Sequence, residues 1–425
     1  MIYIVFLVML VLTYINYFIS RKDIVAPATI AMISLDMGLF FSILGAKSWK
    51  FSMSDKTALV ILVGVFSITL ANICFSGKRT LSVPKTWKDG NTCLYSLKYI
   101  KIATFVSAIL TLLYGVDAYR VGLASGGTGL NAFAYMKAAY ASSTIDSRMN
   151  LFIRQGFKVI LAIAYVHLYI LVSMIIKKEY QKKCMAYLIF SILCAMMVVI
   201  FSGSRTEILQ LLSAAIFMYS IRWRESRSWT PRSNRKSFRQ IVKKAWPLVF
   251  VMMLIGFGSR AIVKVESNTL SATGTFWVYI IYYIGSPFAV LNTKIQKSFS
   301  DGGMIFGTTY SGELAHAQVY LGDLNYGGNA ATFFTSVFTS GVVGMFLRLF
   351  LVVGIGTIIY RSVLINSFDC YKRNRNLIVL SVAYFVFTMA YYADCTGLLT
   401  KNNNIFVCII AILYYKYLSK SMKQM

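Results

Sequence analysis

Long apolar runs separated by short polar segments repeat along almost the whole chain. With its flanks, a run of this kind is long enough to cross a hydrocarbon core of about 30 Å as a helix. In lipid, backbone N–H and C=O groups must be satisfied within their own segment, so each run is predicted to be an α-helix. The predicted membrane-spanning helices are 3–19, 28–44, 58–75, 100–116, 159–176, 185–201, 208–221, 248–263, 342–360, 377–392 and 405–418.

The composition of the chain agrees with this pattern. Hydrophobic residues make up 57% of the 425 residues and charged residues only 14%, with a mean hydropathy of +0.64. A soluble chain of this length would need more polar surface. The predicted fold class is therefore an all-α, polytopic integral membrane protein with about 11–12 transmembrane helices. Residues 1–425 are expected to form a single transmembrane domain, because no linker rich in Pro, Gly or Ser interrupts them.

The first apolar run and the cysteines indicate which processing signals and covalent or metal sites to expect. The run lacks a basic start and a small-residue cleavage site, so we expect a retained helix rather than a signal peptide. The seven cysteines show no metal-ligand spacing, and at most Cys395 lies near the predicted outer face. We therefore expect neither a metal site nor a disulfide framework.

The formal net charge of +28 is concentrated on one side of the predicted helices. If eleven helices alternate in direction, most Lys and Arg residues fall in loops on one side, nine of them between Arg222 and Lys244. Positively charged loops stay in the cytoplasm, which predicts an outer N-terminus and a cytoplasmic C-terminus in the inner (cytoplasmic) membrane. The cytoplasmic basic loop at about 222–246 is predicted to contact anionic lipid head groups rather than nucleic acid.

The irregular sequence gathers in two outer loops, at about 117–153 and 264–340. The second loop is longer than a simple connection needs. Within it, the apolar and aromatic segment 276–291 is predicted to lie at the outer interface or to dip into the membrane and return. A twelfth full crossing is the alternative.

Two Gly-Ser-Arg turns lie where predicted helices reach the outer face, in FSGSRTEI (201–208) and GFGSR (256–260). In the first turn, a serine oxygen can cap the new helix, and its free N–H groups and positive dipole end face outward. Arg205 and Arg260 add guanidinium groups, which match phosphate geometry. Arg120 and Arg154 are expected at the same level. Several arginines at one depth suggest an anionic ligand, phosphate or pyrophosphate, whereas the alternative is capped turns with snorkelling arginines.

Four segments carry a resemblance to a known family. They are FSGSRTEILQLL (201–212), YYIGSPFAVLN (282–292), GTTYSGELAHAQ (307–318) and GGNAATFFTSVFTSGVVGMF (327–346). With the helix number and the large outer loops, they resemble the Wzy-type polymerases, which join oligosaccharide repeat units of O-antigens and capsular polysaccharides. The last motif often carries an acidic residue before its glycine in that family, whereas here Ser340 precedes Gly341.

The resemblance implies a metal-independent membrane glycosyltransferase that needs no cofactor. It would transfer a growing glycan from undecaprenyl pyrophosphate to the sugar of a new undecaprenyl-linked repeat unit. Its partners would be this lipid-linked oligosaccharide, membrane lipids and a chain-length regulator protein that the sequence does not identify. The leaving pyrophosphate needs charge stabilisation, and sugars need aromatic faces and polar partners. The residues expected at the pyrophosphate are Arg205, Arg260, Arg154, Arg120, Ser204 and Ser259, and those expected at the glycan include Tyr282, Tyr283, Tyr310, Tyr320, Tyr326 and Asn329.

The attacking hydroxyl benefits from a base within hydrogen-bond reach. His316 lies three residues after Glu313, which on a helix puts both on one face, so His316 is the predicted base with Glu313 orienting it. An ordinary solvated polar pair is the alternative. His167 lies in the middle of a predicted helix and is expected to be a hydrogen-bonded packing residue. Asp36 and Glu207 are the other candidate carboxylates, and Asp36 could simply pair with an arginine.

Two other membrane activities remain as alternatives. An O-antigen ligase would share the outer arginines, the outer histidine and the lipid-linked donor, and would differ in its acceptor. A flippase or other transporter would show repeated halves and helices broken at mid-membrane, and no half-to-half repeat is evident in the sequence. A membrane acyltransferase and a purely structural protein fit less well.

Overall fold

The computed structural model of the protein describes residues 1–77, 96–129, 132–133, 135–136, 149–178, 181–202, 206–225, 272–299, 304–305, 333–365, 370–392 and 402–420. Every regular element within these ranges is helical, and seven segments are long and apolar enough to cross a membrane. The chain is thus an all-α polytopic membrane protein, as its apolar runs predict. The seven segments are α1 (Ile2–Ile19), α2 (Pro27–Gly45), α3 (Asp55–Ser76), α4 (Leu97–Ala124), α6 (Leu151–Lys177), α7 (Lys182–Phe201) and Phe333–Leu364, which covers η4 (Phe333–Ser336) and most of α12 (Val337–Ile365).

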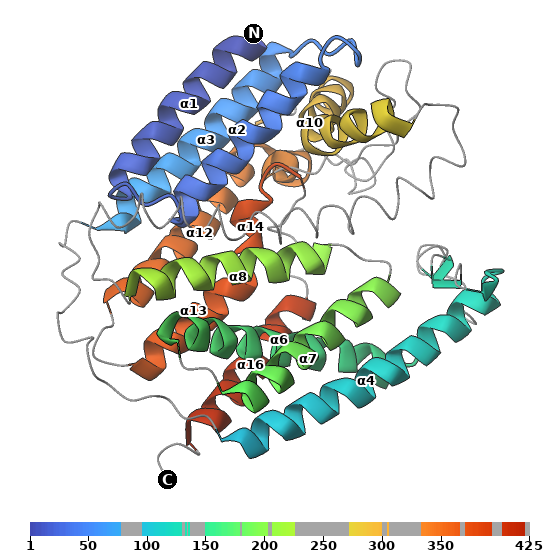
Figure 1. Cartoon of the computed structure of the whole chain (residues 1–425). Coiled ribbons are helices and arrows are strands. Elements are labelled where there is room, and N and C mark those ends of the chain that lie inside the picture. The colour runs from blue at the N-terminus through green and yellow to red at the C-terminus, as the bar shows by residue number, and fades with distance from the viewer. Residues whose placement is uncertain are drawn as a thin grey trace. The chain divides into compact units, whose positions relative to one another are not determined.

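Five further helices complete the described chain (Figure 1). They account for the predicted segments 208–221, 276–291, 377–392 and 405–418, and the predicted helix 248–263 lies outside the described residues. Their bounds are Thr206–Glu225 (α8), Ala272–Ser298 (α10), Cys370–Ala383 (α13), Phe385–Thr388 (α14) and Asn402–Lys420 (α16).

Several helices begin where the local sequence can satisfy the first N–H groups. The Ser54 side chain accepts from the N–H of Thr57 at the start of α3. Asn150 does the same for the N–H of Phe152 at the start of α6. At α2, Pro27 occupies the first turn, where its missing N–H costs nothing.

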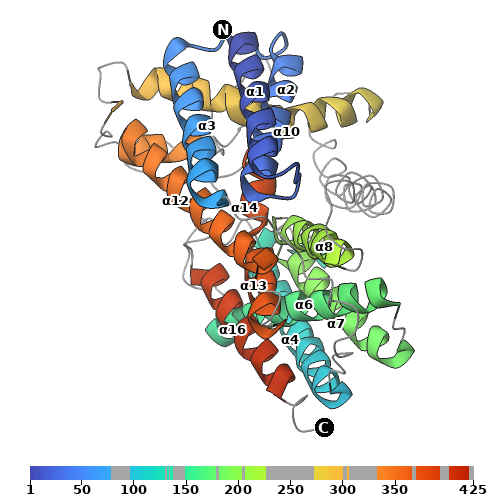
Figure 2. The ribbon, with the colours of Figure 1, turned by 90° about the vertical axis from the view of Figure 1, so that its left-hand side faces the viewer.

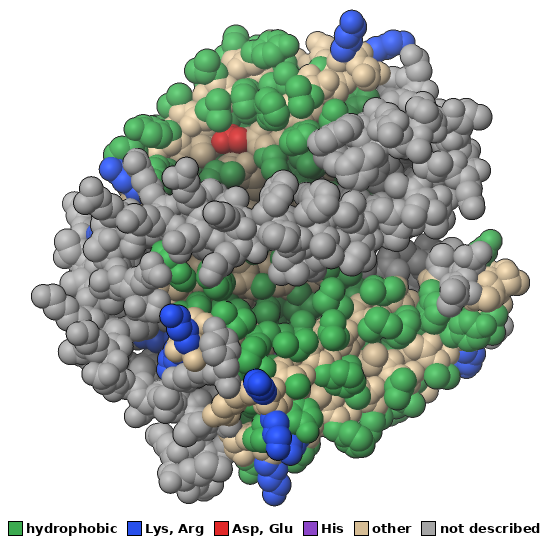
Figure 3. Space-filling model, viewed as in Figure 1, with side chains coloured by type: hydrophobic (Ala, Val, Ile, Leu, Met, Phe, Trp, Pro, Cys, Tyr) green, Lys and Arg blue, Asp and Glu red, His purple; other side chains and the backbone are tan. Residues whose placement is uncertain are grey.

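The chain packs into two compact units. The described part of unit 1 contains α1, α2, α3, α10, η4, α12 as far as Ser362, and residues 386–392. Helices α1, α2 and α3 form an antiparallel group held by buried amides: Asn16 donates to Thr69 Oγ1 at 2.8 Å, and Asn72 donates to Asn16 Oδ1 at 3.0 Å. Apolar side chains cover much of the described surface that faces the viewer of Figure 3, where Lys and Arg form only small, separate groups.

Helix α10 lies across α1, α2 and α3 instead of running beside them (Figure 2). Its Gly285 contacts the α2 backbone so closely that an added Cβ would lie 2.5 Å from the carbonyl carbon of Phe41. Ser42 Oγ also donates to the carbonyl oxygen of Gly285. A small residue at this crossing lets the two backbones approach, as is common where membrane helices pack. Helix α10 includes the predicted segment 276–291.

Unit 2 is built around α6, whose middle is almost entirely buried. Helices α4, α7, α8, α13 and α16 all contact α6. Near the end of α8, Arg222 donates to Ser173 Oγ at 3.0 Å and to the hydroxyl of Tyr169, both on α6. Hydrogen bonds between polar side chains therefore connect α8 to α6 in addition to the apolar packing.

The predicted helix 377–392 is wrong as one continuous helix. The structure ends α13 at Ala383 and follows it with the short helix α14 and turns. Beyond the break, the carbonyl of Thr388 accepts from Ser34 Oγ at 3.0 Å, and that of Ala390 accepts from Phe333 N–H at 3.1 Å. The apolar pattern does not register this change, because both segments remain buried while their backbone groups exchange partners.

Candidate functional site

An aromatic array lies in unit 1 where α10 crosses α2. Trp49, in the connection between α2 and α3, meets Tyr282 edge-on with ring centroids 6.4 Å apart. Tyr282 contacts Tyr283, which stacks on Tyr392 at 6.2 Å, and Tyr392 contacts Tyr391 at 6.1 Å. Aromatic pairs at these separations stabilise one another beyond the area they bury.

The members of this array differ in exposure. Trp49 and Tyr282 are buried at 5% and 9% exposure, so they form part of the core. Tyr283, Tyr391 and Tyr392 are only partly buried. Of the two tyrosines in the array that the sequence predicts at the glycan, Tyr283 therefore keeps more ring surface available than Tyr282.

The C-terminal half of α10 clamps the chain that enters α3. Asn292 accepts from Ser54 N–H and donates to the carbonyl of Ser52, both at 2.9 Å. Lys56 donates to the carbonyl oxygen of Phe299. Lys294, in the same part of α10, is only 1% exposed, and this burial lowers the pKa of its ammonium to about 8.

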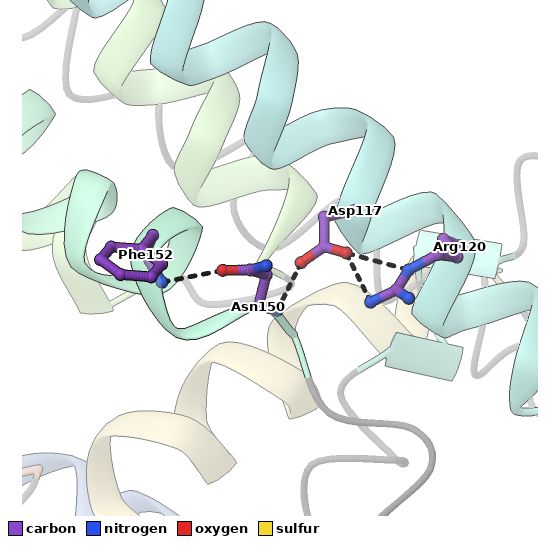
Figure 4. A network of polar contacts seen from close by, with 4 residues as sticks. All are labelled: Asp117, Arg120, Asn150 and Phe152. Atoms are coloured by element: carbon purple, nitrogen blue, oxygen red, sulfur yellow. Dashed lines mark hydrogen bonds and ion pairs between the residues drawn. The ribbon is translucent and has the colours of Figure 1, made fainter.

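In unit 2, one carboxylate joins the end of α4 to the start of α6 (Figure 4). Asp117 Oδ1 accepts from Arg120 Nε at 3.0 Å and lies 2.7 Å from Arg120 Nη2. Asp117 Oδ2 accepts from the backbone N–H of Asn150 at 2.7 Å. Asp117 is 7% exposed at its side chain and Arg120 65% exposed. Much of the Arg120 charge is thus compensated by a residue that sequence reasoning missed, although the i, i+3 spacing of the two could have revealed it.

Arg154 and Lys158 lie one turn apart near the start of α6. Arg154 is exposed, and within the described chain its side chain has no hydrogen bond or ion pair. Lys158 is only 7% exposed, and its Nζ lies 4.7 Å from the ring centroid of Phe406 on α16. Sequence reasoning found Arg154 but missed Lys158, whose only signal is a lysine at the edge of an apolar run.

Most of the other predicted site residues lie outside the described residues. Of the predicted site residues, the structure places Arg120 near the C-terminus of α4 and Arg154 near the N-terminus of α6, and it pairs Tyr282 with Tyr283 in unit 1. The residues outside are His316, Glu313, Arg205, Arg260, Ser204, Ser259, Tyr310, Tyr320, Tyr326 and Asn329.

His167 is a hydrogen-bonded packing residue, as predicted. It is fully buried in unit 2, with Nδ1 bonded to Ser191 Oγ and Nε2 2.8 Å from the hydroxyl oxygen of Tyr414. Both ring nitrogens are therefore occupied by hydroxyl groups of neighbouring helices. A buried imidazole with hydrogen bonds at both nitrogens stabilises the packing of the helices and is not accessible to a substrate.

Asp36 pairs with a hydroxyl group of α1. Its Oδ2 lies 2.6 Å from Thr13 Oγ1, and its Oδ1 has no hydrogen-bond partner among the described residues. The pairing with an arginine that the sequence left open is not observed within the described chain. Asp36 thus links α1 to α2 through one oxygen.

The motif at 327–346 contains a kink in α12 at Gly341. Gly341 has φ 65° and ψ −175°, a conformation that L side chains rarely adopt. Immediately after it, the N–H groups of Val342 and Val343 donate to the carbonyls of Met304 and Ile305 at 3.0 and 3.3 Å. Glycine is favoured at the kink because of its positive φ, and residues 304–305 accept from the first N–H groups of the helical segment that follows.

No protein-family model, no curated protein and no solved structure matches this chain.

Proposed function

We propose that this protein is a membrane glycosyltransferase that polymerises undecaprenyl-pyrophosphate-linked oligosaccharide repeat units into O-antigen or capsular polysaccharide. The observation that carries the proposal is helix α10, which contains the motif 282–292. It lies across the neighbouring spans and arrays Tyr283, Tyr391 and Tyr392 with part of their ring surfaces exposed. On the predicted orientation this aromatic array faces the outer half of the membrane, where the lipid-linked glycan is presented.

Arg154 of unit 2 is a separate feature that suits a pyrophosphate-linked substrate. Arg154 has no hydrogen bond or ion pair within the described chain, so its guanidinium is available to an anion. In contrast, Arg120 is engaged by Asp117, which favours a structural role at the base of the loop. In this proposal Arg154 joins Arg205 and Arg260 in stabilising the leaving pyrophosphate, and His316 with Glu313 supplies the base.

The two units do not coincide with consecutive halves of the chain. Transporters with internal repeats usually place one repeat in each consecutive half of the chain. Here each unit is assembled from three separate stretches of sequence. A ligase remains the second candidate, because the same donor site would serve it.

Deletion of the gene, followed by gel analysis of surface glycan, tests the proposal. Loss of polymerase should leave glycan capped at a single repeat unit on its final carrier. Loss of a ligase would instead leave no glycan on that carrier. An unchanged distribution of polymer lengths would contradict both activities.

A further inference from the structure

The side chain of Lys158 is mostly buried and has no anionic partner within the described chain. Lys158 is 7% exposed, and the described chain gives its Nζ neither a hydrogen bond nor an ion pair, only the ring of Phe406 at 4.7 Å. Burying a charged group is costly unless it is paired. A cation–π contact offsets only part of this cost.

A second positive charge lies beside it. Arg154 precedes Lys158 by four residues, so both lie on one face of α6. Like charges at this spacing destabilise a helix. The face near the N-terminus of α6 therefore holds two neighbouring cations, one on a mostly buried side chain and one on an exposed side chain.

Other stacked lysines of the chain do not share this burial. Lys101 lies over the ring of Tyr187 at 5.5 Å but is exposed, and Lys22 lies over Phe18 at 5.3 Å and is only partly buried. These two keep their ammonium groups near water, as snorkelling side chains do. Lys158 differs from Lys101 and Lys22 because its side chain is covered almost completely by the protein.

We propose that Arg154 and Lys158 bind the phosphate anion of a membrane lipid, with Phe406 bordering its hydrocarbon portion. Phe406 is 47% exposed on α16, so a lipid that contacts its ring can bring a phosphate to Lys158 Nζ. Phosphate would pair both cations and remove their mutual repulsion. The lipid is either an ordinary anionic phospholipid or the undecaprenyl-linked donor, and the second identification rests on the proposed function.

Binding to the full-length protein in lipid nanodiscs tests this site. One arm adds undecaprenyl phosphate to phosphatidylcholine nanodiscs, and a second adds phosphatidylglycerol in its place, with bound lipid counted by native mass spectrometry. Lys158→Met and Arg154→Gln should each weaken binding roughly tenfold or more, the loss expected for one charge-assisted contact. Lys158→Arg should retain most of the binding, and Lys101→Met, the stacked control in the same unit, should retain all of it.

The outcomes separate the two lipids and the two proposals. Selective loss of undecaprenyl phosphate identifies the donor lipid, and selective loss of phosphatidylglycerol identifies a structural phospholipid. Unchanged binding of both lipids in Lys158→Met and Arg154→Gln would overturn the site. If Lys158→Met does not fold, the exposed Arg154→Gln decides alone. Polymerisation is measured separately, so a protein that binds lipid but makes no polymer would sink only the proposed function.

Discussion

Asp117 Oδ1 lies 2.7 Å from Arg120 Nη2, while its second oxygen accepts from the N–H of Asn150 at the start of the next helix. The carboxylate therefore holds both ends of the loop that joins α4 to α6. Because Asp117 is nearly buried and Arg120 is mostly exposed, the two partners contribute unequally.

Asp117→Ala should destabilise the protein by about 1–3 kcal/mol, since it removes the hydrogen bond that this nearly buried carboxylate accepts from the backbone N–H of Asn150. Arg120→Ala should cost no more than about 1 kcal/mol, as for exposed ion pairs. Thermal unfolding of both variants in detergent measures the difference. Loss of activity in Arg120→Ala at unchanged stability would instead make Arg120 a ligand for the substrate.

Lys294 predicts a pH dependence of stability. Its pKa is lowered to about 8 in the folded protein, below the ordinary value of 10.5. Between these values the unfolded chain binds more protons than the folded one, so stability rises with pH. Compared with Lys294→Met, the wild type should gain stability as the pH increases from 8 towards 10, and should show its full deficit below pH 8. If the melting temperatures of the two proteins changed with pH in the same way, the lowered pKa of Lys294 would be refuted.

Substitution of the two histidines should affect different properties, turnover for His316 and thermal stability for His167. His316→Ala should reduce turnover by roughly 10²–10⁴-fold, the usual range for removal of a general base. His167→Ala should lower thermal stability, because it leaves the hydroxyl groups of Ser191 and Tyr414 without their hydrogen bonds to the imidazole. Activity per folded molecule in that variant should stay close to wild type. Near-normal polymer from well-expressed His316→Ala would exclude His316, and Glu313→Gln would then be tested.

The proposed site depends on the predicted orientation of the protein in the membrane. Cysteines placed at Ser125, at the end of α4, and at Ser271 should react with an impermeant maleimide in whole cells. A cysteine at Ser233, in the basic loop, should react only after the membrane is opened. Labelling of the third position in intact cells would reverse the orientation and remove the argument for an outer active site.

The sequence could predict the membrane helices because burial in lipid requires long apolar runs, and α1 matches its run within one residue. It could also predict a helix at 276–291, which lies within α10. It could not predict the break at Ala383, where backbone groups change partners within an apolar segment.

Contacts between distant segments were equally hidden from the sequence. Trp49 meets Tyr282, and Lys158 meets Phe406, only because separate helices pack together. Neither contact leaves a spacing that can be read along the chain. Asp117 and Arg120 differ, because their separation of one helical turn is visible in the sequence itself.

Polymerisation by the purified protein is the decisive measurement of the proposed glycosyltransferase activity. Nanodiscs containing the protein receive undecaprenyl-pyrophosphate-linked repeat units, and the products are separated on glycan gels. The account predicts a ladder of polymer lengths from wild type and a fall of roughly 10–150-fold in Arg205→Ala and Arg260→Ala, the equivalent of one lost charge-assisted contact of about 1.5–3 kcal/mol. Arg→Lys at either position should rescue only partly, because lysine lacks the two-pronged geometry. Absence of any ladder from folded wild-type protein would contradict the account, and full activity in either alanine variant would show that its turn does not bind the pyrophosphate.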